Sequence, residues 1–155
     1  MKKSKKLTAV FALIMDLPLA LIITLVSMLL AKNLNLPGFI MMALLAYVIT
    51  FFVNFLPNDY VGFKFASKFA KPDTLKFGLI INGYISFIFT VILDIIMTAV
   101  GVLVIGHGSF GEYCFAVVAG FIPCYIAAYI IAFIVNPFAD KLSREICKEP
   151  APKYN

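Results

Sequence analysis

Four long apolar runs dominate this chain and limit what it can fold into. They cover residues 7–31, 39–63, 77–105 and 113–136. As an α-helix rising about 1.5 Å per residue, each run is long enough to cross a hydrocarbon core about 30 Å thick. The chain is 63% hydrophobic and 14% charged, whereas soluble domains carry about 25% charged residues. The sequence therefore predicts an all-α fold, an integral membrane four-helix bundle surrounded by the lipid bilayer.

The first run follows a basic start, as a cleaved signal peptide would. However, Asp16 and Pro18 interrupt this run, and its apolar stretch is longer than the central region of a signal peptide. We therefore expect it to stay in the protein as a permanent helix.

Basic residues predict the orientation of the four helices. They gather before the first run, between residues 64 and 76, and after residue 140, whereas the other two loops contain only Lys32. Basic clusters that flank membrane spans mark the cytoplasmic side. We expect both termini in the cytoplasm, and the flanking position of the clusters argues against a nucleic-acid partner.

An internal repeat divides the chain into two halves. A shift of 66 residues places Asp16 on Asn82 and Thr24 on Thr90, and seven further residues bring the segment 65–68 onto 138–141. Because each half crosses the membrane twice, both copies start from the same side. The sequence predicts one membrane domain, residues 1–155, made of two tandem parallel helical-hairpin repeats. Repeat one covers about 7–70, repeat two about 74–144, and 145–155 form a cytoplasmic tail.

The ends of the two hairpins carry a resemblance to a known family. The second hairpin closes with VNPFADKL at 135–142 and the first with FASK at 65–68, although Lys64 stands where the second copy has Pro137. With its duplicated hairpins, the chain resembles the small bacterial membrane proteins called domain of unknown function 2798. That resemblance implies a location in the bacterial inner membrane and supplies no established activity or catalytic residue.

Acidic side chains inside the apolar runs are candidates for function. A charged group at the centre of a bilayer costs at least about 2.5 kcal/mol and usually faces the interior of the bundle. Asp16 and Asp94 lie well inside their runs. The third run also carries polar residues at every fourth position: Asn82, Ser86, Thr90, Asp94 and Thr98. Such a row can line a polar path or form hydrogen bonds with neighbouring helices.

The second run contains a polar segment around a proline. Pro57 removes one backbone donor and predicts a kink beside Asn54, Asn58 and Asp59. One interpretation is a proline-kinked helix end with local capping, beside which Asp59 pairs with Lys64 or another loop lysine. The other brings Asp16, Asn58, Asp59 and Asn82 together in the cytoplasmic half as a cation or proton site.

Small residues form a row on the fourth run. Small side chains let helix backbones approach closely, so this row predicts a face for helix packing or for a dimer. Its members recur every four residues: Ala116, Gly120, Cys124, Ala128 and Ala132. The three cysteines follow no metal or disulfide spacing, and His107 is the only histidine, so we expect neither a metal site nor a cofactor.

Three functions are compatible with these features. The first is a transporter or exporter of a small solute, with coupling to protons as one option, that uses a site formed by Asp16, Asn82, Asp94, Asn58, Asp59 and Thr90. The second is a non-catalytic subunit that binds another membrane protein through the small-residue row. The third is an enzyme acting on lipid, which we rank last because no nucleophile, base or metal ligand accompanies the acids. We expect a transporter that is not an enzyme and that forms a homodimer.

Overall fold

The computed structural model describes residues 4–32, 34–56, 58–72 and 74–150, and within these ranges the secondary structure consists of helices, without strands. The expectation of an all-α fold is therefore confirmed. The elements are α1 (Lys5–Leu30), α2 (Leu36–Val53), α3 (Asn58–Ala66), α4 (Leu75–Thr98), the π-helix η1 (Ala99–Ile105) and α5 (Phe110–Cys147).

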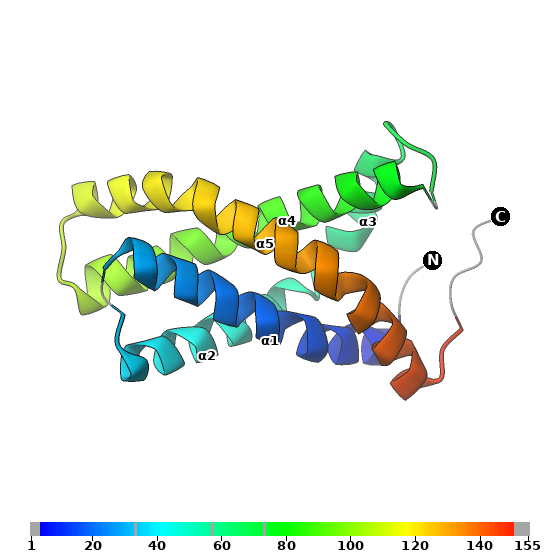
Figure 1. The fold of residues 1–155 in the computed structure, drawn as a ribbon, viewed down its shortest axis with the longest axis horizontal. Coiled ribbons are helices and arrows are strands. Elements are labelled where there is room, and N and C mark those ends of the chain that lie inside the picture. Colours follow the sequence, from blue (N-terminus) through cyan, green and yellow to red (C-terminus); the bar gives the residue numbers. More distant parts are fainter. Residues whose placement is uncertain (1–3, 33, 57, 73, 151–155) are drawn as a thin grey trace.

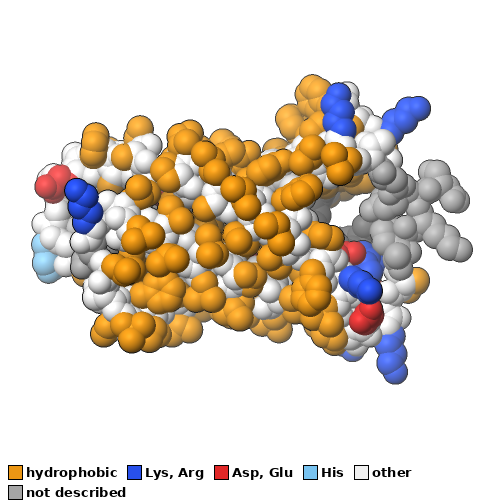
Figure 2. All heavy atoms as spheres, in the orientation of Figure 1, with side chains coloured by type: hydrophobic (Ala, Val, Ile, Leu, Met, Phe, Trp, Pro, Cys, Tyr) orange, Lys and Arg blue, Asp and Glu red, His pale blue; other side chains and the backbone are white. Residues whose placement is uncertain are grey.

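Four segments are long and apolar enough to cross a membrane. They are Lys5–Leu30, Leu36–Val53, Leu75–Ile105 and Phe110–Cys147. Apolar side chains cover the middle of the molecule, and most charged ones lie at its two ends (Figure 2). The larger group of described basic residues belongs to the end that carries both termini: Lys5, Lys6, Lys64, Lys68, Lys71, Lys76, Lys141, Arg144 and Lys148.

Short polar side chains fix where the long helices begin. The first backbone N–H groups of a helix have no partner inside it, and a Ser, Thr or Asn side chain at the N-cap accepts from one of them. Here each cap accepts from the backbone N–H three residues further on: Ser4 from Leu7, Asn35 from Gly38, Thr74 from Phe77 and Ser109 from Glu112.

The helices form a bundle with α1 and α4 at opposite corners. α1 packs against α2 and α5, while α4 packs against α5, α2 and α3. In Figure 1 the two termini and the α3–α4 loop lie at one end, and the α1–α2 and η1–α5 connections lie at the other. α1 and α4 therefore run in the same direction, and α5 runs antiparallel to both.

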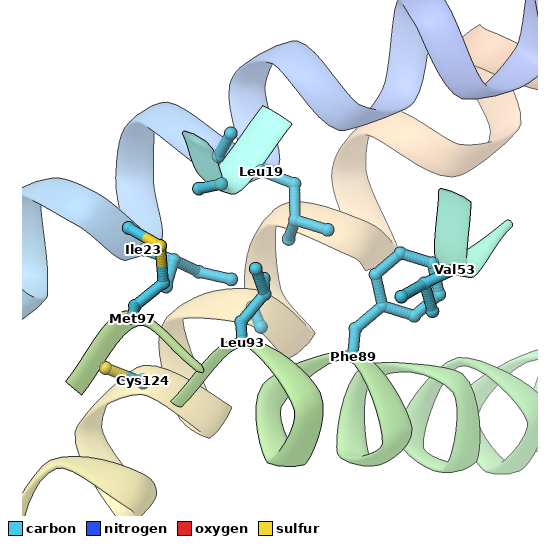
Figure 3. Packing of buried hydrophobic residues seen from close by; sticks show 10 residues of the cluster. Leu19, Ile23, Val53, Phe89, Leu93, Met97 and Cys124 are labelled. Atoms are coloured by element: carbon cyan, nitrogen blue, oxygen red, sulfur yellow. The ribbon is translucent and has the colours of Figure 1, made fainter. Parts of the chain in front are cut away.

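The apolar core takes side chains from all four long helices. It joins Leu19, Ala20 and Ile23 of α1 with Ala46 and Val53 of α2, Phe89, Leu93 and Met97 of α4, and Cys124 and Ala128 of α5. Figure 3 shows side chains of α1 and α4 pointing toward one another across this core. The polar residues described below are embedded next to it.

The second apolar run is not one kinked helix, as the sequence predicts, but two helices. α2 ends at Val53, and α3 begins at Asn58. Proline has no N–H to donate to the carbonyl four residues back. The carbonyl of Val53 accepts from the Leu56 N–H instead, at 3.1 Å, in a tighter turn that ends the helix. Pro57 itself lies outside the described residues.

After the break, α3 packs along the start of α4. The ring centroids of Phe63 and Phe77 are 5.2 Å apart, and those of Phe65 and Tyr84 are 5.4 Å apart. Gly62 lies against the Tyr84 ring, where an added Cβ would come within 3.1 Å of it. The aromatic contacts thus hold α3 against α4 instead of in line with α2.

The fourth helix extends beyond its apolar run. The sequence places its end near Asn136, but α5 continues through Pro137 to Cys147. Arg144 and Asp140, one turn apart, form an ion pair at 2.7 Å in this extension. α5 stops at Lys148, whose φ of 56° is left-handed. Hydropathy therefore located the apolar part of this helix but not its end.

Candidate functional site

A buried carboxylate and an amide connect α1 to the broken end of α2. Asp16 is completely buried, and the Asn54 side-chain nitrogen lies 2.8 Å from each of its two oxygens. The same nitrogen donates to the carbonyl of Thr50 at 3.1 Å. Asn54 is the C-cap of α2, so one amide group both closes that helix and binds the carboxylate.

A second polar pair connects α4 to α5. The Asn136 side-chain nitrogen donates to the Asn82 side-chain oxygen at 2.7 Å, and Asn82 is buried. Met15 and Val135, the chain neighbours of Asp16 and Asn136, belong to one apolar cluster. The two polar pairs therefore lie at similar depth in the half of the bundle that carries the termini.

The polar row of α4 faces the interior of the bundle. Asn82, Ser86, Thr90 and Asp94 are all buried, with exposed fractions of 8% or less, and Thr98 is partly buried. The Thr98 hydroxyl donates to the Oδ1 atom of Asp94 at 3.3 Å. Among the described residues, the Ser86 and Thr90 hydroxyls and the Oδ2 atom of Asp94 have no hydrogen-bond partner.

The unpaired oxygens in this row are unusual for a folded protein. Leaving a buried polar atom without a partner costs about 1–3 kcal/mol, and more when the atom is charged. Thr50 shows the ordinary solution, because its hydroxyl donates to the carbonyl of Ala46, one turn back, at 3.0 Å. Ser86 and Thr90 do not use it. Thr24, the residue that the repeat aligns with Thr90, is also buried and unpaired.

The small-residue row of α5 packs inside the chain. Cys124, Ala128 and Ala132 are buried, while Ala116 and Gly120 are partly buried. A Cβ placed on Gly120 would lie 3.3 Å from the Oδ1 atom of Asp94, so a glycine here lets the carboxyl group reach the α4–α5 contact. The Cys124 sulfur lies 3.5 Å from the Ser27 hydroxyl of α1. This row is therefore in use as a packing face between the chain's own helices.

No family model, curated protein or solved structure matches the chain. The resemblance to domain of unknown function 2798 therefore stays a prediction. What can be inferred about function depends on the side chains and their geometry.

The structure brings together only part of the predicted site. Asp16 and Asn82 each bind an asparagine of the partner helix in their own hairpin, and Thr90 and Asp94 lie further along α4. The side chains of Asn58 and Asp59 lie outside the described part, so their inclusion in the site stays a prediction. Among the described residues, no group of three His, Cys, Asp or Glu side chains is placed to hold a metal ion.

Sequence reasoning missed two members of this site, Asn54 and Asn136. Both are amides in or next to a long apolar run, which is the same signal that singled out Asn82. The sequence places Asn54 beside the predicted kink at Pro57 and Asn136 at the end of the fourth run. Neither position indicates which acidic or amide group lies opposite, because that depends on how the helices cross.

At the opposite end of the bundle, Glu112 forms the start of α5. Its carboxylate accepts from the Ser109 backbone N–H at 2.6 Å and from the Ser109 hydroxyl at 3.0 Å. These bonds, the backbone one first, hold the pKa of Glu112 below its usual value. Glu112 precedes the apolar run 113–136 and is exposed, so its role is to cap the N-terminus of α5.

Proposed function

We propose that this chain is a four-span protein of the bacterial inner membrane that transports or exports a small solute, coupled to protons through Asp94 and Asp16. One observation carries the proposal: Asp94 is buried inside the bundle, with only the Thr98 hydroxyl bonded to it among the described residues. A carboxyl group without a fixed partner is free to take up and release a proton. Structural acids are normally paired, and intramembrane acids commonly belong to proton relays.

Asp16 is the second acid in this proposal. It is buried at the depth of Asn82, in the half of the bundle that we place toward the cytoplasm, and its bond to Asn54 lies at the break between α2 and α3. A helix interruption of this kind is where transporters commonly place a binding site. Proton exchange at Asp16 would therefore act directly on the α2–α3 break.

The membrane placement and the repeat are parts of the same proposal. Support for the placement comes from four apolar helices and from basic residues gathered at the end with both termini. Support for tandem hairpins comes from the parallel courses of α1 and α4 and from the equivalent burial of Thr24 and Thr90. The hairpins differ in their second helix, which is broken in the first and continuous in the second.

Transport in proteoliposomes tests the proposal. The full chain is reconstituted into vesicles loaded with the pH-sensitive dye pyranine, and amino acids, sugars and quaternary ammonium ions are added one at a time. We expect at least one class to change the internal pH in wild type and to do so much less in Asp94→Asn and Asp16→Asn. Asp140→Asn is the matched control, because Asp140 pairs with Arg144 beyond the apolar run.

Two results would contradict the proposal. An unchanged response in both Asp16→Asn and Asp94→Asn would remove the two acids from the mechanism. A wild type that gives no response to any solute class would remove proton-coupled transport itself.

The subunit hypothesis lacks a comparable observation. It assigned partner binding to the small-residue row, yet the central members of that row are buried against the chain's own helices. A partner would have to bind another face of the molecule. We therefore keep transport as the proposed function.

A further inference from the structure

We infer that the α4 row from Ser86 to Asp94 is a proton path in which one water molecule bridges each pair of neighbouring oxygens. This inference rests on the proposed function for its membrane setting, and it specifies how a proton moves along the row. The observation behind it is the line of buried oxygens without partners: the Ser86 hydroxyl, the Thr90 hydroxyl and the Oδ2 atom of Asp94.

The spacing of the row suits one bridging water per gap. Residues four apart on an α-helix are separated by about 6 Å along the axis. Two hydrogen bonds in line, at about 2.8 Å each, span nearly the same length. Thr98 and Asp94 meet directly at 3.3 Å, but the Ser86 and Thr90 hydroxyls and the Oδ2 atom of Asp94 form no direct hydrogen bond with one another. Two waters in a row would need three hydrogen bonds, which together are longer than the distance between neighbouring residues of the row. Buried waters typically satisfy polar groups that have no other partner.

The orientation of the hydroxyls favours a path over simple packing. Buried Ser and Thr side chains in a helix can donate to the carbonyl one turn back, as Thr50 does. The Ser86 and Thr90 hydroxyls are not bonded in this way and remain available to a bridging molecule. A hydroxyl that both donates and accepts can pass a proton between two waters.

The ends of the row fit the two ends of a path. Asp94 provides a group that binds and releases a proton, and it lies against Gly120, whose lack of a side chain lets the carboxyl group approach the α5 backbone. At the other end, Asn82 is bonded to Asn136 at the depth of Asp16. The path thus leads from one acid of the proposed mechanism toward the other.

The same geometry argues against a metal ion as the transported species. A bound metal ion needs several oxygen atoms that converge on one point. In this row the oxygens follow one another along the helix, and the neighbouring Phe89 and Leu93 pack into the apolar core. Protons, in contrast, need only a continuous line of hydrogen bonds.

Voltage-driven proton flux tests the path without any solute. Vesicles containing the full chain and pyranine are given a potassium diffusion potential with valinomycin, and acidification is compared with that of empty vesicles. Wild type should acidify faster than empty vesicles. Thr90→Val, which removes one hydroxyl at nearly constant volume, should lower the protein-dependent rate by about tenfold or more, the loss expected from breaking one link. Thr90→Ser should retain most of the rate.

Matched variants separate the path from general damage. Ser86→Ala should reduce the flux, whereas Ser143→Ala should not, because the buried Ser143 hydroxyl already donates to the carbonyl of Asp140 at 3.0 Å. Circular dichroism and gel filtration identify any variant that fails to fold. If Thr90→Val is such a variant, Ser86→Ala against Ser143→Ala still tests whether a hydroxyl of the row is needed.

Three outcomes would overturn the inference. They are no protein-dependent acidification in wild type, an unchanged rate in Thr90→Val, and a flux that follows a sodium gradient at constant pH. Any of these can occur while solute transport still depends on Asp94, in which case the proposed function stands and the path is wrong. Voltage-driven flux that depends on Thr90, without a response to any solute, supports the path and contradicts the proposed transport.

Discussion

The contact between Asp16 and Asn54 should be the strongest polar coupling measurable in this protein. Replacing Asn54 with Leu leaves a completely buried carboxyl group without its amide donor. Leaving a buried carboxyl group without its hydrogen-bond donor costs about 3 kcal/mol. Replacing Asp16 alone should cost less, because the Asn54 amide keeps its bond to the Thr50 carbonyl. Replacing both by Leu should restore much of the stability, since neither substitution then leaves the other side chain of the pair without its partner.

A double-mutant cycle gives the magnitude. Hydrogen bonds to charged groups contribute about 1.5–3 kcal/mol, so we expect a coupling energy near 2 kcal/mol for Asp16 and Asn54. The Asn82–Asn136 contact is as short, at 2.7 Å, but joins two neutral amides. Hydrogen bonds between membrane helices average about 0.6 kcal/mol in such cycles, which is the value we expect for this second pair.

Reversible unfolding in mixed detergent micelles, followed by far-ultraviolet circular dichroism, supplies the stabilities of wild type and of the two single and one double variants of each cycle. Equal coupling energies in both pairs would show that the Asp16 contact gains nothing from charge. A coupling near zero for Asp16 and Asn54 would refute the contact itself, and with it the link between this acid and the α2–α3 break.

Two further predictions concern the ends of the bundle. A membrane-impermeant maleimide applied to intact cells should label the exposed Cys114 and should reach Cys147 only after permeabilisation. The buried Cys124 should stay unlabelled until the protein unfolds. Labelling of Cys147 before Cys114 would show that the proposed orientation is inverted. Because the folded pKa of Glu112 is lowered, its stabilisation of the α5 start should be complete above the usual carboxyl pKa and disappear as the pH falls through the lowered value. Carboxyl chemical shifts should show Ser109→Ala raising that pKa only in part, since the backbone N–H of residue 109 still donates; a full return to the usual value would contradict this.

In the membrane setting that we propose, much of the fold follows from the sequence because lipid imposes a simple rule. A long apolar run must be helical there, since its backbone groups have no water to bind. A polar side chain within it must turn away from the acyl chains. The four-residue spacing from Asn82 to Asp94 therefore predicted a buried face, and the burial of these residues confirms it. The same rule indicated that Asp16 is buried.

Other features depend on choices that the lipid rule leaves open. Pro57 is compatible with a kink or with a helix end, and the Leu56–Val53 turn and the aromatic contacts of α3 with α4 favour the end. The partners of Asp16 and Asn82 depend on how each hairpin crosses, so Asn54 and Asn136 could not be assigned by spacing. The extension of α5 to Cys147 is held by the Asp140–Arg144 pair, which apolar periodicity does not detect.

Protons and solutes place different demands on this bundle. The α4 row lies within one chain, where Gly120 of α5 approaches Asp94 and the apolar core packs beside the hydroxyls. Hydroxyls bridged by single waters need little volume, whereas a solute site typically occupies about 300–1,000 Å³. Four helices with a closely packed core have room for bridging waters more readily than for a solute site. We therefore expect the solute path to form between two copies. Because the small-residue row is already used inside each chain, those copies should meet through outward-facing apolar side chains, and the α4 row would then supply protons to a site that neither copy builds alone.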